Sequence, residues 1–224
     1  DMNPPPLIIA LLCNILLTYK TRFVLIETNH NSNAGAAARA IKTMGFDELF
    51  LVNPRDSKIL SRRETINNAS GAKDVLQKAE ICSSLEKSLE GFDYWCATAM
   101  PNDMSRKRTQ WKFLAPRMYF ENLLCKRKKS SSIALSNVHS KTILSEEKLC
   151  EEPKEIKFTE EAHEEVRIAF IFGNERFGMQ EEDIRKCHAV LGIPTNPNFG
   201  SLNLASSVQL IAYDWREAIG GFKV

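Results

Sequence analysis

Three segments of this chain share one arrangement, in which a short apolar run leads into glycine, asparagine and a charged or hydroxyl residue. They lie at residues 23–39, 168–178 and 193–204. Ligands of open α/β sheets bind beyond the carboxyl ends of the strands. If each apolar run is a strand of one sheet, the three polar segments meet at the same edge. The sequence therefore predicts one composite pocket, built from parts of the chain that are far apart.

Short apolar runs alternate with helix-favouring segments along most of the chain. The run at 23–26 reads as a buried strand, and an Ala-rich helical segment follows at 34–43, ended by Gly45. Such alternation predicts an α/β fold with a mostly parallel sheet and helices on both faces. The predicted strands are 23–26, 49–52, 94–98, 167–172 and 189–193, and the predicted helices are 34–43, 62–69, 85–89, 116–125, 180–186 and 202–219.

A chain of 224 residues is long enough for one well-buried α/β domain and short for two. We place this domain at 23–222. Residues 126–165 begin with a basic run, become rich in glutamate and contain almost no aromatic residues. That composition cannot bury enough apolar surface to fold alone, so we expect a mobile insertion within the domain.

Residues 1–22 form an apolar tail outside the predicted domain. Its apolar run at 7–17 is eleven residues long, whereas a membrane-spanning helix needs about 20. No basic residue precedes the run, and no small-residue cleavage site is evident. A degraded organelle-targeting piece, an added packing element and an artefact of the gene model all remain open. We expect no membrane association and an intracellular protein, in the cytoplasm or, for a eukaryotic source, in a chloroplast or mitochondrion.

The formal net charge of +2 does not by itself indicate a nucleic-acid partner, so any affinity for RNA must come from local patches. The basic runs at 105–108 and 126–129 are candidates. None of the six cysteines forms a Cys-x-x-Cys pair, and no histidine lies at zinc-ligand spacing from them. We therefore expect reduced thiols, several of them in the core, and no metal site.

The three polar segments resemble those of the SpoU–TrmH branch of the SPOUT RNA methyltransferases. In that branch an asparagine, glycine and arginine segment comes first, then Gly-Asn-Glu, then Ser-Leu-Asn ahead of a final helix. This chain has the three motifs in that order, at 33–39, 173–175 and 201–203. Residues 27–30 and Glu175-Arg176 are most similar to the TrmJ type within the branch. The resemblance covers about 23–125 and 166–219.

This resemblance implies a C-terminal deep trefoil knot, which periodicity would never predict, and a homodimer formed through the first and last helices. It implies a methyltransferase that uses S-adenosylmethionine, with S-adenosylhomocysteine as the product, and methylates a ribose 2′-hydroxyl of RNA without a metal. A tRNA nucleotide of the anticodon loop is a more expected substrate than rRNA. The alternatives are an rRNA 2′-O-methyltransferase of the same branch and a non-catalytic RNA-binding member of the fold.

Four residues are expected in the catalytic set by this resemblance: Arg39, Asn33, Glu175 and Ser201. A guanidinium has a pKa above about 12, so Arg39 is better suited to hold a phosphate and stabilise an alkoxide than to act as a base. Taken alone, it could be a surface residue of an Ala-rich helix. Glu175 is expected to accept hydrogen bonds from Arg39 or the substrate. Asn33 is expected to orient Arg39 or the ribose, and Ser201 to bond the ribose oxygen or the cofactor, with helix capping as the alternative for both.

The remaining expectations concern the cofactor and the RNA. Gly35 is expected to let the backbone approach substrate or partner closely. Arg176 is a candidate phosphate contact, with a structural ion pair as its alternative. The basic run contributes Arg106, Lys107 and Arg108, unless these are simply solvated. The cofactor residues implied by the resemblance are Thr98, Ala99, Met100, Gly173, Ile193, Gly200, Ser201, Leu202 and Asn203.

Overall fold

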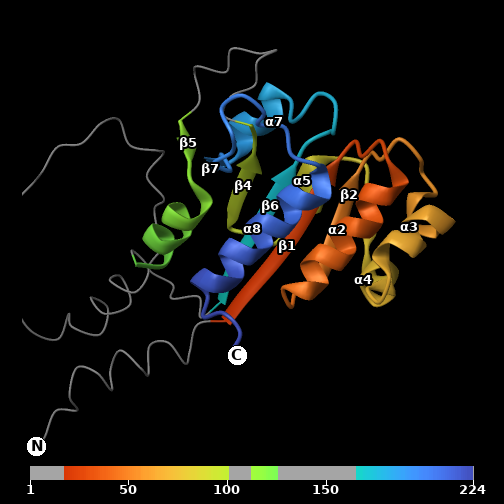
Figure 1. Ribbon diagram of the computed structural model, residues 1–224, viewed down its shortest axis with the longest axis horizontal. Coiled ribbons are helices and arrows are strands. Elements are labelled where there is room, and N and C mark those ends of the chain that lie inside the picture. Colours follow the sequence, from red (N-terminus) through yellow and green to blue (C-terminus); the bar gives the residue numbers. More distant parts are fainter. Residues whose placement is uncertain (1–17, 101–111, 126–164, 224) are drawn as a thin grey trace, which may run out of the picture.

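The computed structural model describes residues 18–100, 112–125 and 165–223. Seven strands form one sheet, in the order β3-β2-β1-β6-β4-β7-β5, and every neighbouring pair is parallel (Figure 1). The basic run 105–108, most of the N-terminal tail and all of the predicted insertion except Glu165 lie outside the described residues, and Glu165 begins β6. The strands are β1 (Thr18–Ile26), β2 (Glu48–Val52), β3 (Glu80–Cys82), β4 (Tyr94–Thr98), β5 (Phe113–Leu114), β6 (Glu165–Phe172) and β7 (Ala189–Leu191).

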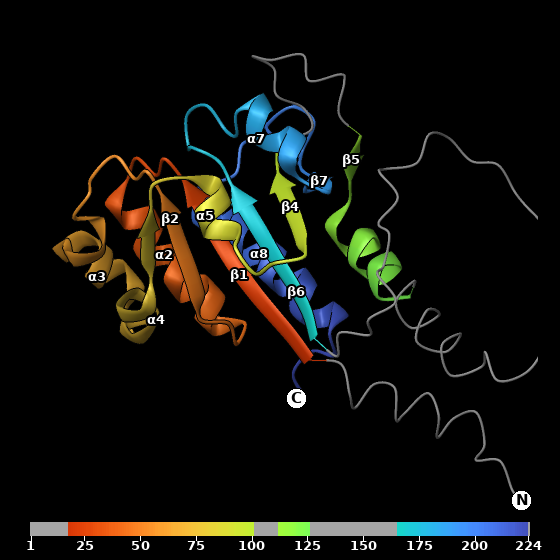
Figure 2. The ribbon, with the colours of Figure 1, turned by 180° about the vertical axis from the view of Figure 1, so that it is seen from behind.

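Helices cover both faces of this sheet, so the predicted α/β arrangement is confirmed. Helices α2 and α8 and the helix at 116–125 contribute buried residues to one face, which Figure 1 shows in front. Helices α5 and α7 contribute to the other, which Figure 2 shows. The described helices are α2 (Asn31–Thr43), α3 (Arg63–Ala69), α4 (Lys73–Lys78), α5 (Leu85–Leu89), 116–125, α7 (Glu181–Lys186) and α8 (Leu204–Ala218), with a 3-10 turn η1 (Ile59–Ser61).

Strand β1 begins at Thr18, five residues before the predicted start of the domain at Phe23. Residues 18–22 therefore belong to the sheet and not to the tail. They pair with β6 from Thr18 opposite Glu165 onward. Aromatic and β-branched residues alternate with basic ones at 18–22, and this alternation favours a strand. The basic residues Lys20 and Arg22 interrupt the apolar pattern, so the start of the strand was not recognised from the sequence. Arg22 is nevertheless buried, because Glu48 accepts from its Nε at 3.0 Å.

Two edge strands and one helix were not predicted from the sequence. Strands β3 and β5 have three and two residues, which is too short for an alternating pattern to be recognised. Helix α4 has six residues. The predicted helices at 85–89 and 116–125 and the strand at 94–98 have the predicted bounds. Helix α8 starts two residues later than predicted, because Asn203 caps it: the Ala205 amide donates to Asn203 Oδ1 at 2.9 Å.

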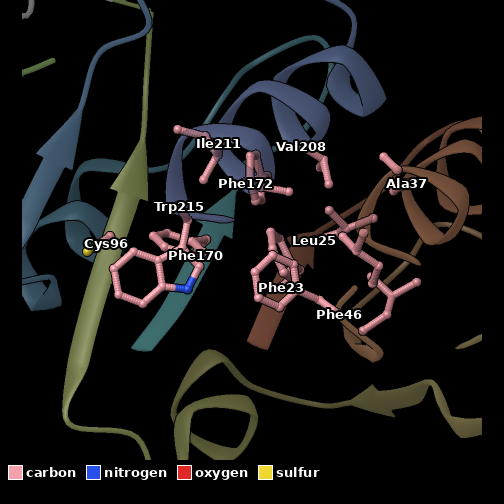
Figure 3. Packing of buried hydrophobic residues seen from close by; sticks show 14 of the residues in the cluster. Phe23, Leu25, Ala37, Phe46, Cys96, Phe170, Phe172, Val208, Ile211 and Trp215 are labelled. Atoms are coloured by element: carbon pink, nitrogen blue, oxygen red, sulfur yellow. The ribbon is translucent and has the colours of Figure 1, made fainter. Parts of the chain in front are cut away.

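An aromatic cluster anchors α8 on the sheet (Figure 3). Trp215 is fully buried, and its ring meets those of Phe170 and Phe120 edge to face at centroid distances of 5.9 and 5.2 Å. Its indole Nε1 donates to Thr21 Oγ1 at 2.8 Å. A buried indole needs such a partner. Thr21 of β1 therefore fixes how the final helix lies across the sheet.

The described cysteines are all free, as predicted, and differ in environment. Cys96 is buried in the core, Cys82 and Cys187 are half-buried, and Cys125 is exposed. Burial raises the pKa of the Cys187 thiol to about 12, so this thiol stays protonated. Among the described helices, none has the length and apolar character to cross a membrane.

The backbones of α2 and α3 are in direct contact at Gly35. A Cβ on this residue would lie 2.1 Å from the carbonyl oxygen of Thr65 and 3.0 Å from the amide nitrogen of Ala69. Gly35 was expected to let the backbone approach a substrate or partner closely, but the close approach is to α3 of the same chain. A glycine is needed here because no side chain fits between the two helices.

We predict that Gly35→Ala lowers the free energy of unfolding by about 1–3 kcal/mol, the usual cost of overpacking. The better helix propensity of alanine offsets only about 1 kcal/mol. Gly71→Ala is the matched control, because a Cβ there meets nothing within 4 Å. Urea unfolding followed by circular dichroism measures both. Equal stability of the two variants would contradict the proposed helix contact.

Candidate functional site

A cavity of about 600 Å³ lies at the carboxyl ends of β4, β6 and β7. In Figure 2 the arrowheads of β4 and β6 point towards this edge. Eight of the nine expected cofactor residues line it: Thr98, Ala99, Met100, Gly173, Ile193, Gly200, Ser201 and Leu202. The other lining residues are Phe172, Asn174, Glu175, Arg176, Phe177, Gly178, Thr195, Leu204 and Ser207. The composite pocket predicted from the sequence is therefore present, although the segment after β1 reaches it only through hydrogen bonds.

Those hydrogen bonds converge on the carboxylate of Glu175. It accepts from the backbone amides of Asn29 at 2.8 Å and His30 at 3.3 Å, and from Asn33 Nδ2 at 2.9 Å. Asn33 Oδ1 in turn accepts from Asn203 Nδ2 at 3.0 Å. We call Asn29, Asn33, Asn174, Glu175 and Asn203 the strand-end network. It joins the segments that follow β1, β6 and β7, as the sequence pattern predicted.

Asn174 is the part of this network to which the sequence analysis gave no role. Its Nδ2 donates to the Glu27 carbonyl at 2.7 Å, and its Oδ1 accepts from Asn29 Nδ2 at 3.1 Å. The same Oδ1 accepts from the Arg176 amide at 2.8 Å, which closes a turn after β6. An asparagine two residues after the end of a buried strand was the available signal, because its side chain can bond nearby backbone groups.

Gly173 is required by this turn rather than by a ligand alone. A Cβ there would lie 2.2 Å from both the carbonyl carbon of Gly178 and the amide nitrogen of Met179. The chain folds back at this point, and Asn174 and Gly178 exchange backbone hydrogen bonds of 3.2 and 2.7 Å. Gly178 has φ of 65°, a left-handed conformation that favours glycine. The two glycines thus shape one wall of the cavity.

The alternative that Asn33 and Ser201 are merely helix caps is wrong. Helix α2 is preceded by His30, and Asn33 lies inside the helix, buried and bonded to Glu175 and Asn203. The cap of α8 is Asn203, so Ser201 lies two residues outside the cap, exposed and lining the cavity. Neither Asn33 nor Ser201 therefore caps a helix, although asparagine and serine are residue types that favour the N-cap position.

Arg39 does not join the strand-end network. It is exposed on α2 and lies six residues after Asn33, which is about 9 Å along the helix axis. It is absent from the residues that line the cavity. The expected hydrogen bond from Arg39 to Glu175 is not formed, because Arg39 lies on the exposed side of α2, more than one helical turn beyond Asn33. Within one chain, Arg39 thus lies apart from the other three residues of the predicted catalytic set, Asn33, Glu175 and Ser201.

The remaining expected residues differ in what their side chains can offer. Arg176 is exposed and lines the cavity, and no ion pair between described residues involves it, so the structural alternative is not supported. Thr98 Oγ1 already donates to the Ile171 carbonyl at 2.9 Å. The described residues contain no group of histidine, cysteine and carboxylate side chains suited to a metal ion.

A second hollow, of about 720 Å³, lies at the opposite edge, between the start of β1 and the end of α8. It is larger, but its basic side chains already bind a carboxylate or carbonyl oxygens of the same chain. Lys20 pairs with Glu48 at 3.3 Å. Arg216 donates to the carbonyls of Met44 and Gly45 at 2.7 and 3.1 Å. The smaller cavity at the carboxyl edge, with polar groups facing inward, is the stronger candidate for a site.

Comparison with known proteins identifies the family of the chain. The model of the SpoU rRNA Methylase family matches residues 20–120 and 120–213. A tRNA (cytidine/uridine-2'-O-)-methyltransferase TrmJ of Photorhabdus laumondii is 34% identical over 197 residues, which cover 88% of this chain and 64% of that protein. The chain therefore spans less than two thirds of that relative.

Two solved structures are similar as well. A probable methyltransferase from Bordetella pertussis Tohama I aligns with a TM-score of 0.65 and 29% identity, over 92% of this chain and 99% of that one. TrmJ from Z. mobilis ZM4 aligns with a TM-score of 0.62 and 25% identity, over 88% of this chain and 68% of that one. Because the family model matches nearly the whole described domain, this chain belongs to the SpoU rRNA methylase family.

Proposed function

We propose that this protein is an S-adenosylmethionine-dependent RNA ribose 2′-O-methyltransferase that acts on tRNA. The observation that carries the proposal is the strand-end network, in which Glu175, Asn33 and Asn203 tie three motif segments to one cavity. The 2′-O-methyltransferase activity named for the TrmJ relative supports the reaction, and its tRNA substrate supports the RNA class. An rRNA substrate is the alternative within the family.

The cavity fits S-adenosylmethionine in size and chemistry. About 600 Å³ is within the range of small-molecule sites. Its walls include the apolar side chains of Ile193 and Leu202, which can hold an adenine ring. At Gly200 a Cβ would meet Thr195 Oγ1 at 3.0 Å and Met100 Sδ at 3.4 Å, so a side chain would fill the space. The exposed hydroxyl of Ser201 is available to a cofactor or ribose oxygen.

When bound, this cofactor supplies a methyl group that is already electrophilic on its sulfonium. The protein must therefore hold the ribose oxygen in line with the methyl group and help to remove its proton. Positioning alone can contribute about 7–11 kcal/mol to lowering the barrier. Glu175 fixes the loop after β1 beside the cavity, and Ser201 offers a hydroxyl at its wall. We assign the ribose to the space between them.

Arg39 has a different role in this proposal. Because a guanidinium remains charged at all ordinary pH values, it cannot serve as an effective base. A cationic fork can hold a phosphate beside the target ribose and stabilise the developing alkoxide. Its exposed position on α2 leaves it accessible to a large substrate. It acts, in this proposal, on RNA that reaches the rim of the α2–α8 dimer interface proposed below.

We also propose a homodimer through the outer faces of α2 and α8. These helices pack against each other on one face of the sheet (Figure 1). The outer side of α8 exposes Leu210 and Tyr213, with 41% and 44% of their surfaces accessible. Arg39 lies on the exposed side of the neighbouring helix. A second copy covering this face would bury the apolar pair and bring Arg39 to the interface.

The knot is the last part of the proposal. Strand β7 lies beyond β4, on the far side from β6, and α8 then returns to pack on α2. The final segment therefore crosses the carboxyl ends of β4 and β6. This crossing and the family membership support a C-terminal deep trefoil knot whose loops enclose the cofactor.

We expect the protein to transfer labelled methyl groups from S-adenosylmethionine to tRNA isolated from cells that lack this protein. Mapping of methylated riboses should locate the acceptor in the anticodon loop, and methylation of rRNA instead would select the alternative. Omitting RNA is the control. Cofactor binding without transfer to any RNA fraction would replace the enzyme by a non-catalytic RNA-binding member of the fold.

We predict that Arg39→Ala reduces methyl transfer by roughly a hundred- to a thousandfold, or about 2.7–4 kcal/mol, while cofactor affinity stays within a few-fold. The reason is that Arg39 lies outside the cavity that the cofactor would occupy. Arg39→Lys should restore little, because an ammonium cannot reproduce a bidentate fork. Near-normal turnover of Arg39→Ala would remove this residue from the mechanism, and lost folding would make its role structural.

We predict that Leu210→Lys combined with Tyr213→Lys converts a dimer into a monomer, because four flexible charges would then meet at the two-fold interface. Light scattering at micromolar concentration measures the mass. Met118→Lys is the matched control, since Met118 is 64% exposed and lies on the helix at 116–125, away from α2. A wild-type monomer with full methyl-transfer activity would refute the dimer.

A further inference from the structure

The segment that joins β2 to α3, residues 53–63, carries an excess of positive charge. Its charged residues are one acid, Asp56, and four basic ones, Arg55, Lys58, Arg62 and Arg63. All four basic residues are exposed. With four basic side chains and one carboxylate the segment has a formal net charge of +3, larger than the +2 of the whole chain. We call residues 53–63 the basic loop.

Pairing within the basic loop neutralises only one of its four cations. Asp56 Oδ1 accepts from Arg62 Nη2 at 3.0 Å and from the Lys58 amide at 2.9 Å. The side chains of Arg55, Lys58 and Arg63 form no ion pair with a described residue. Arg63 is also the first residue of α3, where a cation is unfavourable. These three cations therefore do not stabilise the loop or the helix that carries them.

Hydrogen bonds and one buried side chain hold the backbone of the basic loop in place. Ile59 is fully buried, and its carbonyl accepts from Thr65 Oγ1 at 2.6 Å. The amide and the hydroxyl of Ser61 both donate to the Lys58 carbonyl at 3.0 Å. A ligand of this loop therefore does not have to order the backbone first, which reduces the cost of binding.

The basic loop lies at the same edge of the sheet as the cavity. Strands β2, β1 and β6 are parallel neighbours, so their carboxyl ends lie together. The Arg55 amide donates to the Thr28 carbonyl at 3.1 Å, which joins the basic loop to the loop after β1. The next residue, Asn29, donates its amide to Glu175 of the cavity wall at 2.8 Å. Two strand spacings of about 4.8 Å each separate the ends of β2 and β6. A polymer that enters the cavity can therefore extend over the loop after β1 to the basic loop.

We propose that the basic loop binds the phosphate backbone of the RNA beside the target nucleotide, through Arg55, Lys58 and Arg63. This inference rests on the proposed function, since it extends the site of an RNA whose ribose enters the cavity. Phosphate contacts fix the register and orientation of a nucleic acid without reading its bases. The three residues are therefore positioning residues: they hold the strand while the 2′-hydroxyl reaches Ser201.

The test measures how the affinity of the full chain for tRNA from cells that lack this protein depends on salt concentration. Arg55→Gln with Arg63→Gln removes two cations and keeps the backbone hydrogen bonds of the loop. Arg55→Lys with Arg63→Lys keeps the charge.

Lys73→Gln with Lys223→Gln is the matched control, because both lysines are exposed and form no ion pair with a described residue. Neither lies near the basic loop. Asp74, next to Lys73, pairs with Lys42 in the last turn of α2 at 2.6 Å, and Lys223 follows the end of α8.

We expect the glutamine variant of the basic loop to bind RNA more weakly at low salt. Its plot of log affinity against log salt should be shallower by about 1.4–1.8, since each lost phosphate contact removes about 0.7–0.9 from the slope. The KM for RNA should rise while kcat stays unchanged, as for a contact that is equally strong in the ground and transition states. The lysine variant should keep the wild-type slope, because an ammonium still contacts a phosphate as a point charge. The control should match wild type, and cofactor affinity and melting temperature should be unchanged in all variants.

Three results would overturn the phosphate contacts. A wild-type slope in the glutamine variant would show that the basic loop does not meet the RNA and serves another partner. An equal change in the Lys73 and Lys223 control would reduce the effect to net charge alone. A loss of kcat or cofactor affinity would make the loop part of the catalytic site or of the fold. If wild type methylates RNA while any of these holds, only this inference fails; if wild type methylates no RNA, the proposed function fails with it.

Discussion

The carboxylate of Glu175 organises the carboxyl edge of this sheet. It accepts hydrogen bonds from two backbone amides and one side-chain amide, all from the segment that follows β1. Hydrogen bonds to an ionised acceptor are stronger than neutral ones, and the loss of such an acceptor would leave partly buried donors unpaired. Because Glu175 itself follows β6, one side chain holds together two loops about 145 residues apart in sequence. Asn33 is held at the cavity by this attachment, and Asn203 is held through Asn33.

Small residues allow the backbones around this attachment to come close. Gly35 lets α3 touch α2, so that the first turn of α2 lies beside Glu175. Gly173 lets the segment after β6 fold back on itself, so that Asn174 and Gly178 exchange backbone hydrogen bonds. These contacts are internal to the chain. Gly35 and Gly173 therefore allow close backbone packing within the chain, and this packing in turn shapes the cavity.

The two edges of the sheet carry opposite kinds of polar chemistry. At the amino edge, charged groups pair with each other or with carbonyls, as Lys20 does with Glu48 and Arg216 with Met44. At the carboxyl edge, Ser201 and Arg176 face the cavity, and no ion pair between described residues includes Arg176. Among the described residues, the cation available to a ligand of the cavity therefore lies at the carboxyl edge.

The sequence by itself determined the α/β class, most elements and the segments that border the cavity, because apolar periodicity and polar strand ends are local patterns. It did not determine that β1 begins at Thr18, because basic residues alternate there with strand-forming ones and Glu48 neutralises Arg22 only in the fold. Only the tertiary structure decided that Asn33 bonds Glu175 and Asn203 instead of capping a helix. It likewise decided that Arg39 lies apart from them, since its place on the helix surface depends on how α2 packs against α3 and α8. Tertiary packing determines which distant segments come within hydrogen-bonding distance, and a local sequence pattern does not contain that information.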